Sequence, residues 1–267
     1  GGHGEDGTLQ GVLELAGLPY VGAGVLASSV GMDKDLMKRV FRDAGLPVVR
    51  SLTLLRTEWE TARGKCLESM NLGFPCFVKP ANTGSSVGIT KARSMMDLGR
   101  GLDTAFRYDR KAVIEEGVDA REIECSVLGN DAAEASIPGE IVPCNEFYDY
   151  EAKYLAEGSQ LLIPAPITPE LSEEVRRLAV SAFRAIDGSG MARVDFFLDR
   201  RGGGVFINEV NTLPGFTPIS MYPKLWEASG VPYATLLDRL IDLAMQRHRD
   251  KMKTVSDFRP ESEARKS

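Results

Sequence analysis

The sequence predicts an α+β fold, and its length, its composition and the order of its apolar patterns all point to this class. A chain of 267 residues can bury the cores of two ordinary domains, and 43% hydrophobic with 26% charged residues is the balance of a globular protein. Apolar residues at helical spacing and short apolar runs typical of strands follow each other irregularly, not in a strict strand–helix–strand series. This balance argues against a disordered or fibrous chain.

The first 31 residues resemble part of a larger unit. Residues 1–7 form a glycine-rich turn with no strand before it, residues 9–15 predict a short helix, and residues 18–22 predict a strand. We interpret residues 1–31 as the remnant of an N-terminal α/β domain and expect that 60 to 90 upstream residues, about the size of a small domain, are absent.

The next segment, residues 32–122, is expected to form a central lobe. Its elements, in order, are a helix over 29–43, a strand over 48–55, a helix over 58–70, a strand over 74–80, a helix over 94–106 and a strand over 112–116.

Residues 123–250 are expected to form a C-terminal lobe. Strands are predicted near 123–127 and over 133–142, a helix follows the Thr168-Pro169 start signal, residues 191–198 and 205–210 form a hairpin, and a last helix covers 234–247. The polar, tyrosine-rich segment 143–159 is interpreted as an active-site lid, and 251–267 as a disordered tail.

Composition excludes several classes of function. A formal net charge of -6 gives no broad cationic surface, so we expect no nucleic-acid or membrane partner. No apolar run approaches the roughly 20 residues that span a bilayer, and no leader opens the sequence, which predicts a cytoplasmic protein.

Cysteine and histidine chemistry is also improbable. The four cysteines lack CxxC spacing and are interpreted as buried and reduced, and there are only two histidines. Catalysis must then use lysine, arginine, carboxylates, hydroxyls, backbone amides and a metal held by oxygen.

Lys79 ends a buried strand and precedes a loop of small residues, 80–89. Amides in such a loop can approach an anion closely, which favours phosphate binding, although a plain turn is the alternative. Because the lysine precedes the glycines, the common P-loop is not supported.

The predicted hairpin carries a candidate metal site. Side chains two residues apart share a face of a strand, so Arg193 pairs with Asp195 and Glu209 with Asn211. If 195 lies opposite 209, two carboxylates and an amide oxygen meet, and these are ligands that Mg²⁺ prefers. The alternative is a solvated strand face with a surface ion pair.

Glu115, Glu116 and Gly117 end another strand. Such a linker between lobes could present backbone groups to adenine, with Glu122 facing ribose hydroxyls; a bare acidic turn is equally compatible.

Together these residues carry a family resemblance. Lys79 with its loop, Glu115 to Val118, the string FYDYEAKY at 147–154, Arg193-Val194-Asp195 and NEVNTLPGFT at 208–217 occur in this order. Over about residues 4–243 the chain closely resembles the D-alanine:D-alanine ligases of the ATP-grasp superfamily. The resemblance implies an ATP-grasp fold, in which two α+β lobes grip ATP.

The resemblance also implies roles for single residues. Lys34, Lys79 and Lys153 match phosphate contacts; Glu115, Glu116 and Val118 match the adenine linker, and Glu122 the ribose carboxylate. Because Glu116 stands where the family often has lysine, we expect its adenine contact through the backbone. Asp195, Glu209 and Asn211 match ligands of two Mg²⁺ ions, with Mn²⁺ as the alternative metal, and Arg193 matches the side chain that steadies the transferred phosphate.

The implied reaction joins two D-alanine molecules through D-alanyl phosphate. Ser220 and the amide of Met221 match the grip on the second substrate's carboxylate, Gly215 lies near the oxyanion, and Ser85 and Tyr154 match a pair that holds two loops over the site. Glu5 keeps its place in the Gly-Glu-Asp-Gly turn, whereas the family's glutamate for the first amino group lies upstream of this sequence, and His3 is out of the family's place.

Several alternatives stay open. One is a D-alanine:D-lactate ligase, although the loop ending at Tyr154 resembles the dipeptide-forming branch. Others are a catalytically incomplete ATP-binding fragment and a kinase that releases the acyl phosphate. The family is usually dimeric, so the full-length protein is expected to be a homodimer.

Overall fold

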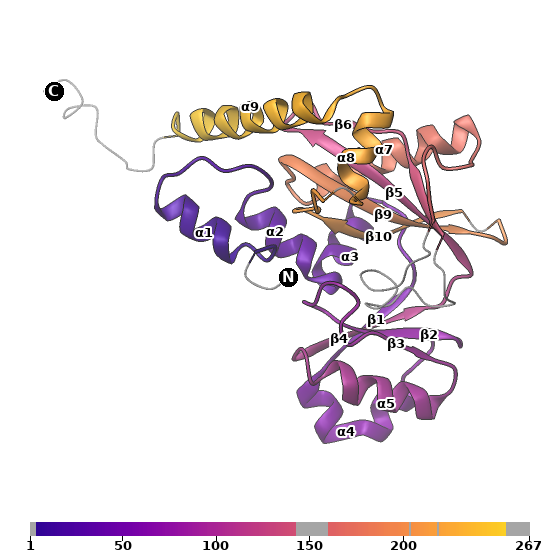
Figure 1. The fold of residues 1–267 in the computed structure, drawn as a ribbon. Helices are drawn as coiled ribbons and strands as arrows, with labels where there is room; N and C mark the ends of the chain where they lie inside the picture. The colour runs from indigo at the N-terminus through magenta and orange to yellow at the C-terminus, as the bar shows by residue number, and fades with distance from the viewer. Residues whose placement is uncertain (1–3, 143–159, 203, 218, 255–267) are drawn as a thin grey trace, which may run out of the picture.

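The computed structural model describes residues 4–142, 160–202, 204–217 and 219–254. They form two lobes, each built on an antiparallel sheet, and Figure 1 shows the smaller lobe below the larger one. None of the helices described is long and apolar enough to cross a bilayer.

The smaller lobe is a four-stranded sheet in the order β1-β4-β2-β3, with both of its helices on one face (Figure 1). Its elements are β1 (Ser51–Leu55), α4 (Arg56–Glu68), β2 (Cys76–Pro80), β3 (Thr90–Ala92), α5 (Met95–Ala105) and β4 (Lys111–Glu116). Val78, Leu98, Leu102 and Ile114, none more than 1% exposed, pack between sheet and helices. Burial of this apolar stripe is what holds the two helices on the sheet.

The larger lobe is a six-stranded sheet in the order β10-β9-β5-β7-β8, with β6 paired to β5. Its elements are β5 (Ala120–Gly129), β6 (Glu134–Ala135), β7 (Gly139–Val142), β8 (Gln160–Leu162), α7 (Pro169–Ala185), β9 (Gly190–Asp199), β10 (Val205–Asn211), α8 (Met221–Ala228) and α9 (Tyr233–Lys251).

Helices cover both faces of the larger sheet. Alternate strand residues such as Ala192, Val194 and Phe196 pack in one core with α7, whereas Leu128 and Met191 pack in a second core with α8 and α9. Since side chains alternate across a strand, Arg193 and Asp195 point toward the side of α8. Arg121 and Glu140, which form an ion pair, lie instead on the face of Ile123 and Phe196.

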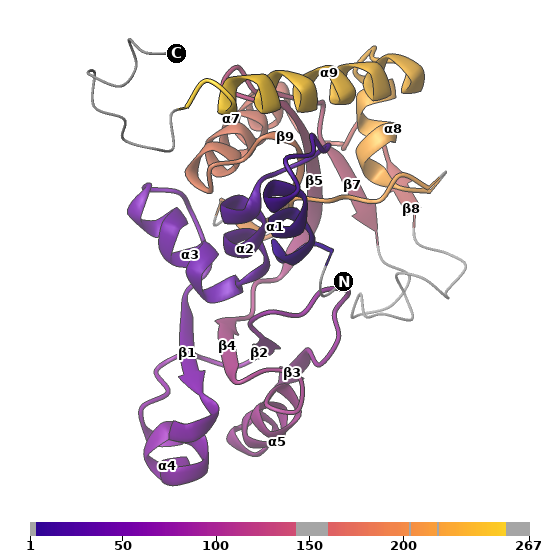
Figure 2. The same ribbon diagram turned by 90° about the vertical axis from the view of Figure 1, so that its left-hand side faces the viewer.

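The N-terminal helices are α1 (Thr8–Leu15), α2 (Val25–Met32) and α3 (Lys34–Asp43). Ala27 of α2 and Met37 and Phe41 of α3, all 0% exposed, belong to the core under the larger sheet. Figure 2 places α3 where the two lobes meet.

Three expectations for secondary structure were wrong. Residues 18–22 form no strand; the carbonyls of Tyr20 and Gly22 instead accept hydrogen bonds from the Arg247 guanidinium. The single helix expected over 29–43 is two helices, because Asp33 adopts an extended conformation and caps α3.

The strand expected over 133–142 is also split, into β6 and β7. The elements β3, β8 and α8 were not predicted, and the lid expected at 143–159 lies outside the described residues. The predicted hairpin forms, and its register, which the sequence left open, places Asp195 opposite Glu209 across β9 and β10.

Candidate active site

Two adjoining cavities lie where the lobes meet. The first has a volume of about 650 Å³ and the second about 730 Å³. Both are lined by Lys34, Ser85 and Glu209. The two cavities therefore share part of their walls.

The first cavity collects the residues expected to bind nucleotide. Residues from both lobes line it, and the predicted ones among them are Lys34, Lys79, Glu115, Glu116, Val118 and Glu122. Residues 117–119, which join β4 of the smaller sheet to β5 of the larger, form one edge. The cavity therefore lies between the two lobes and has cations that suit a nucleoside triphosphate.

Glycine at position 117 is a steric requirement of this linker. A Cβ atom there would lie 2.5 Å from the carbonyl oxygen of Pro75, which accepts a hydrogen bond from the Gly117 amide at 2.9 Å. Beside it, Glu116 Oε1 accepts from the Arg50 amide at 3.1 Å. The Glu116 side chain is thus bonded to the smaller lobe.

A buried group of three charges lies behind the first cavity. Glu115 Oε2 is 2.7 Å from Lys79 Nζ, and Glu115 Oε1 is 3.2 Å from Lys38 Nζ. Burial opposes the charge of Glu115, but the two ammonium groups overcome it and lower its pKa to about 2. Burial lowers the pKa of Lys38.

This group also reaches the other lobe. Lys79 Nζ donates to Asn208 Oδ1 at 3.3 Å, and Lys38 Nζ donates to the Asn208 carbonyl at 3.4 Å. Asn208 sits at the irregularity of β10 directly before Glu209. Lysines of α3 and β2 are thereby tied to the strand that carries the predicted metal ligands.

The loop after β2 has an unusual backbone. Ser85 and Ser86 have φ values of 52° and 59°, in the left-handed region that non-glycine residues seldom adopt and that often marks functional sites. Lys34 Nζ donates to the Thr83 carbonyl at 2.5 Å. Burial lowers the pKa of Lys34, and the Glu209 carboxylate partly offsets this effect.

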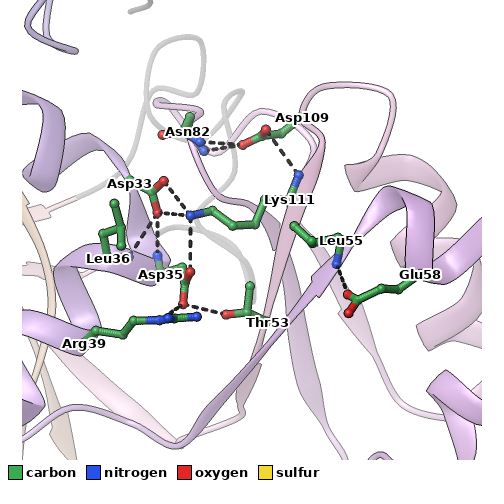
Figure 3. A network of polar contacts seen from close by, with 10 residues as sticks. All are labelled: Asp33, Asp35, Leu36, Arg39, Thr53, Leu55, Glu58, Asn82, Asp109 and Lys111. Carbon is green, nitrogen blue, oxygen red and sulfur yellow. Dashed lines mark hydrogen bonds and ion pairs between the residues drawn. The ribbon is translucent and has the colours of Figure 1, made fainter.

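Figure 3 shows the polar network that holds the start of α3. Asp33 accepts hydrogen bonds from the amides of Asp35 and Leu36, both at 3.1 Å, and its carboxylate also binds Lys111. The helix begins at Lys34 because Asp33 satisfies amides of the first turn.

The hairpin brings its charged residues together. Arg193 binds Asp195 through two hydrogen bonds, each 2.7 Å, and its Nε lies 3.0 Å from Glu124 Oε2. These carboxylates overcome the cost of burial and raise the pKa of Arg193. Arg193 therefore stays charged at the wall of the second cavity.

The three predicted metal ligands offer oxygen atoms, which suit a magnesium ion. Asp195 and Glu209 face each other across the ladder, and Asn211 is two residues further along the same face. No group of three or more histidine, cysteine or acidic side chains placed to hold a metal occurs among the described residues. Two carboxylates and an amide suit Mg²⁺ that takes its remaining ligands from nucleotide and water.

The second cavity collects the residues expected to bind substrate. It is lined by Glu5, Arg193, Asn211, Gly215, Ser220 and Met221. Met221 begins α8, whose N-terminal amides favour a carboxylate. A Cβ atom at Gly215 would lie 2.8 Å from Ser220 Oγ, so a larger residue here would displace the Ser220 side chain.

Lys153 and Tyr154, both predicted in the lid, lie outside the described residues. The sequence reasoning also missed residues that the structure brings to the site: Lys38, Glu124, Asn208 and Lys224. Lys38 lies four residues after Lys34 and Glu124 two after Glu122, so their spacing from predicted residues was the available signal.

Comparison with known proteins identifies the family. Residues 40–242 match the family described as D-ala D-ala ligase C-terminus. The D-alanine--D-alanine ligase of Heliobacterium modesticaldum is 57% identical over 262 residues, which cover 97% of this chain and 72% of that protein. The enzyme of Bacillus licheniformis is 54% identical over 260 residues, covering 97% of this chain and 72% of its own length.

Solved structures agree with the sequence matches. The D-alanine-D-alanine ligase of Coxiella burnetii superposes with a TM-score of 0.82 at 42% identity, over 95% of this chain and 68% of that one. The VanG D-Ala:D-Ser ligase of Enterococcus faecalis also gives 0.82, at 40% identity, over 91% and 70% of the two chains. The α+β fold with its two lobes is therefore the ATP-grasp fold expected from the sequence, and the chain belongs to the D-alanine:D-alanine ligase family.

Proposed function

We propose that this chain carries the site for ATP-dependent joining of two D-alanine molecules into D-alanyl-D-alanine, a peptidoglycan precursor. The observation that carries the proposal is the meeting of two cavities at Lys34, Ser85 and Glu209. One has the cations and linker suited to ATP; the other has an arginine and a helix N-terminus suited to a substrate carboxylate.

In the first step, a carboxylate oxygen of one D-alanine attacks the γ-phosphorus of ATP. The bond from phosphorus to the β–γ bridging oxygen breaks, so D-alanyl phosphate and ADP form. Lys34 and Lys79 offset the phosphate charge, and Arg193 steadies the phosphoryl group as it moves between the cavities.

Magnesium would be held by Asp195, Glu209 and Asn211, where it would neutralise charge on the nucleotide phosphates. Two ions, as in the family's pattern, belong to this proposal, with Mn²⁺ as the alternative. Glu115 and Val118 would border adenine, Glu116 would contact it through its backbone, and Glu122 would face the ribose.

In the second step, the amine of the other D-alanine attacks the acyl carbon. The tetrahedral centre collapses, and the bond from carbon to the phosphate oxygen breaks. Inorganic phosphate leaves with the electron pair of this bond, and the proton lost by the amine passes to the departing phosphate. Ser220 and the Met221 amide would hold the acceptor's carboxylate, and the Gly215 amide would face the developing oxyanion.

Other parts of the proposal rest on the family resemblance. Glu5 would help to hold the first D-alanine, Lys153 would reach the γ-phosphate, and Ser85 with Tyr154 would keep the lid over the acyl phosphate. We also propose that the two lobes span residues 32–122 and 123–250. The protein would act in the cytoplasm, and at full length it would form a homodimer.

The test is ADP release with Mg-ATP and D-alanine, with the product identified by mass. D-Lactate and D-serine are supplied in turn as second substrates, the latter because the VanG structure is named as a D-Ala:D-Ser ligase. D-Alanyl-D-alanine should be the main product and should disappear in Glu209→Gln, whereas Glu227→Gln on the exposed side of α8 should keep full activity.

Other outcomes separate the alternatives. ADP release with D-alanine but without a dipeptide product would indicate a carboxylate kinase. ATP binding without turnover would indicate an incomplete binding fragment, and preference for D-lactate or D-serine would reassign the acceptor.

A further inference from the structure

Lys111 lies at the start of β4, between two carboxylates from the first turn of α3 (Figure 3). Its Nζ is 2.6 Å from Asp33 Oδ2 and 3.2 Å from Asp35 Oδ2. The Lys111 side chain is 12% exposed, so these ion pairs are largely shielded from water. Lys111 thereby joins a strand of the smaller lobe to the helix that presents Lys34.

Backbone hydrogen bonds also connect Lys111 to Lys34. The Lys111 carbonyl accepts from the Ala81 amide at 2.9 Å, and the Ala81 carbonyl accepts from the Lys34 amide at 3.0 Å. Lys34 Nζ then donates to the Thr83 carbonyl in the loop between β2 and β3, residues 81–89, which we call the serine loop. Side chain and backbone of Lys111 thus hold Lys34 from two directions.

Asp109, two residues before Lys111, extends this support to the serine loop. Its Oδ2 accepts from the Asn82 amide at 2.8 Å and from Asn82 Nδ2 at 2.9 Å, while Oδ1 accepts from the Lys111 amide at 3.3 Å. The loop start and the first turn of α3 therefore depend on one short segment, residues 109–111.

Charge explains why a cation is needed at this point. Asp33 and Asp35 are two residues apart, and both face Lys111. Burial would raise the pKa of Asp35, but hydrogen bonds from Thr53, Arg39 and Lys111 lower it. Without Lys111 the two carboxylates would repel each other, and Asp33 would cap α3 less firmly.

We propose that Lys111 is a positioning residue for the ATP polyphosphate: it fixes the first turn of α3 and thereby places the Lys34 ammonium group between the two cavities. This inference rests on the proposed function, in which Lys34 contacts the phosphates. It assigns a role to a residue that lines neither cavity.

The experiment measures binding of ATP, ADP and adenosine by calorimetry and by displacement of a fluorescent ADP analogue. In Lys111→Met, we expect ATP and ADP to bind about tenfold more weakly, the size of one hydrogen bond to a charged group, and adenosine to bind as before. Lys111→Arg, which keeps the cation, should recover most of the affinity. Arg39→Met is the matched control, because Arg39 binds the same Asp35 at 2.8 Å but with a side chain that is 61% exposed.

A double-mutant cycle separates positioning from general damage. Lys111→Met should cost little further ATP affinity when Lys34 is already methionine. Equal loss in both backgrounds, or equal loss for adenosine and ATP, would overturn the inference. If Lys34→Met weakens ATP and Lys111→Met does not, the positioning role alone fails; if Lys34→Met has no effect, the proposed phosphate site fails with it.

Discussion

At the scale of single residues, Lys38 is the most deeply buried charge near the site. It is 0% exposed and shares Glu115 with Lys79. Burial of an ammonium group is costly unless a carboxylate offsets it, and removing one partner of such a pair leaves the other poorly compensated. Lys38 thus stabilises the charge of Glu115, the carboxylate that also binds Lys79.

Replacing Lys38 by methionine should lower stability in a pH-dependent way. The pKa of Glu115 is about 2 in the folded protein, whereas an unperturbed glutamate, as in the unfolded chain, has a pKa of 4.5. Charged Glu115 therefore stabilises the wild type fully above about pH 4.5, and this contribution is lost as the pH falls toward 2. Urea unfolding should show Lys38→Met less stable by up to about 3 kcal/mol at pH 7, with the gap narrowing in acid.

The matched control for this prediction is Lys65→Met, because Lys65 is exposed. It should stay within about 0.5 kcal/mol of the wild type at every pH. A Lys38→Met deficit that does not change between pH 7 and pH 3 would contradict the role assigned to Glu115.

Glu124 should act on catalysis through Arg193. Its carboxylate is the partner of Arg193 that remains if Asp195 turns to a metal. Glu124→Gln should therefore lower kcat about tenfold, less than the roughly hundredfold or greater loss on removing a direct transition-state donor, and should leave KM for ATP nearly unchanged. Steady-state kinetics would check this against Glu173→Gln on the exposed face of α7; a raised KM with normal kcat would argue against it.

The roles of Lys38 and Glu124 could not be read from sequence for a physical reason. The helical pattern places Lys38 beside Lys34, but only the tertiary fold brings Glu115 and Asn208 against that face of α3. The pairing of Asp195 with Glu209 could likewise be stated from sequence only as a condition. The regular register from Val205 opposite Leu198 would place Asn208 opposite Asp195, and the irregularity between Ile207 and Glu209 brings Glu209 there instead.

At the scale of elements, two glycines differ in whether the structure would accept a side chain in their place. Gly190 begins β9 with φ 72°, and a Cβ atom there would lie 3.0 Å from the Gly22 amide nitrogen. Gly11 lies inside α1, and a Cβ atom there would meet nothing within 4 Å. One position requires glycine, whereas the other only tolerates it.

The same substitution should therefore change stability in opposite directions. Gly190→Ala should lower the free energy of unfolding by more than about 1 kcal/mol through backbone strain and crowding, and Gly11→Ala should raise it by about 0.5 to 1 kcal/mol through helix propensity. Urea denaturation of both variants is the measurement. Loss of stability in Gly11→Ala would show that α1 is not a helix with an open face.

Long elements with strong patterns were predictable, whereas short and tertiary-dependent ones were not. Thr168 caps α7 and Pro169 opens it, as its sequence signal indicates. β3 and β8 have three residues each, too few for a periodic pattern to emerge. Asp33 ends one helix and caps the next inside a continuous helical pattern, which propensity alone does not resolve.

At the scale of the whole molecule, both lobes contribute to the first cavity, in which we propose that ATP binds. Lys79 and Glu115 come from the smaller sheet, and Phe197 and Glu209 from the larger. A ligand that binds only when both lobes are folded stabilises them together.

Mg-ATP should therefore raise the thermal unfolding temperature. At about 100 times its Kd the ligand adds about 2.7 kcal/mol to the free energy of unfolding. Removing divalent ions with a chelator should abolish most of the shift, and Glu209→Gln should show a reduced shift even with magnesium present. An unchanged shift in the chelator would mean that the metal does not support nucleotide binding.

The route of the chain through its two cores sets an order for folding. Ala27, Met37 and Phe41 share a core with residues 123–210, while residues 54–114, which lie between these parts in the sequence, build a core of their own. The smaller lobe can thus form from contiguous chain, whereas the larger must close a loop around it at greater entropic cost. In pulse-labelling hydrogen exchange during refolding, amides of β2 and β4 should gain protection before those of α3, so α3 and the lysines it carries should be among the last parts of the site to assemble.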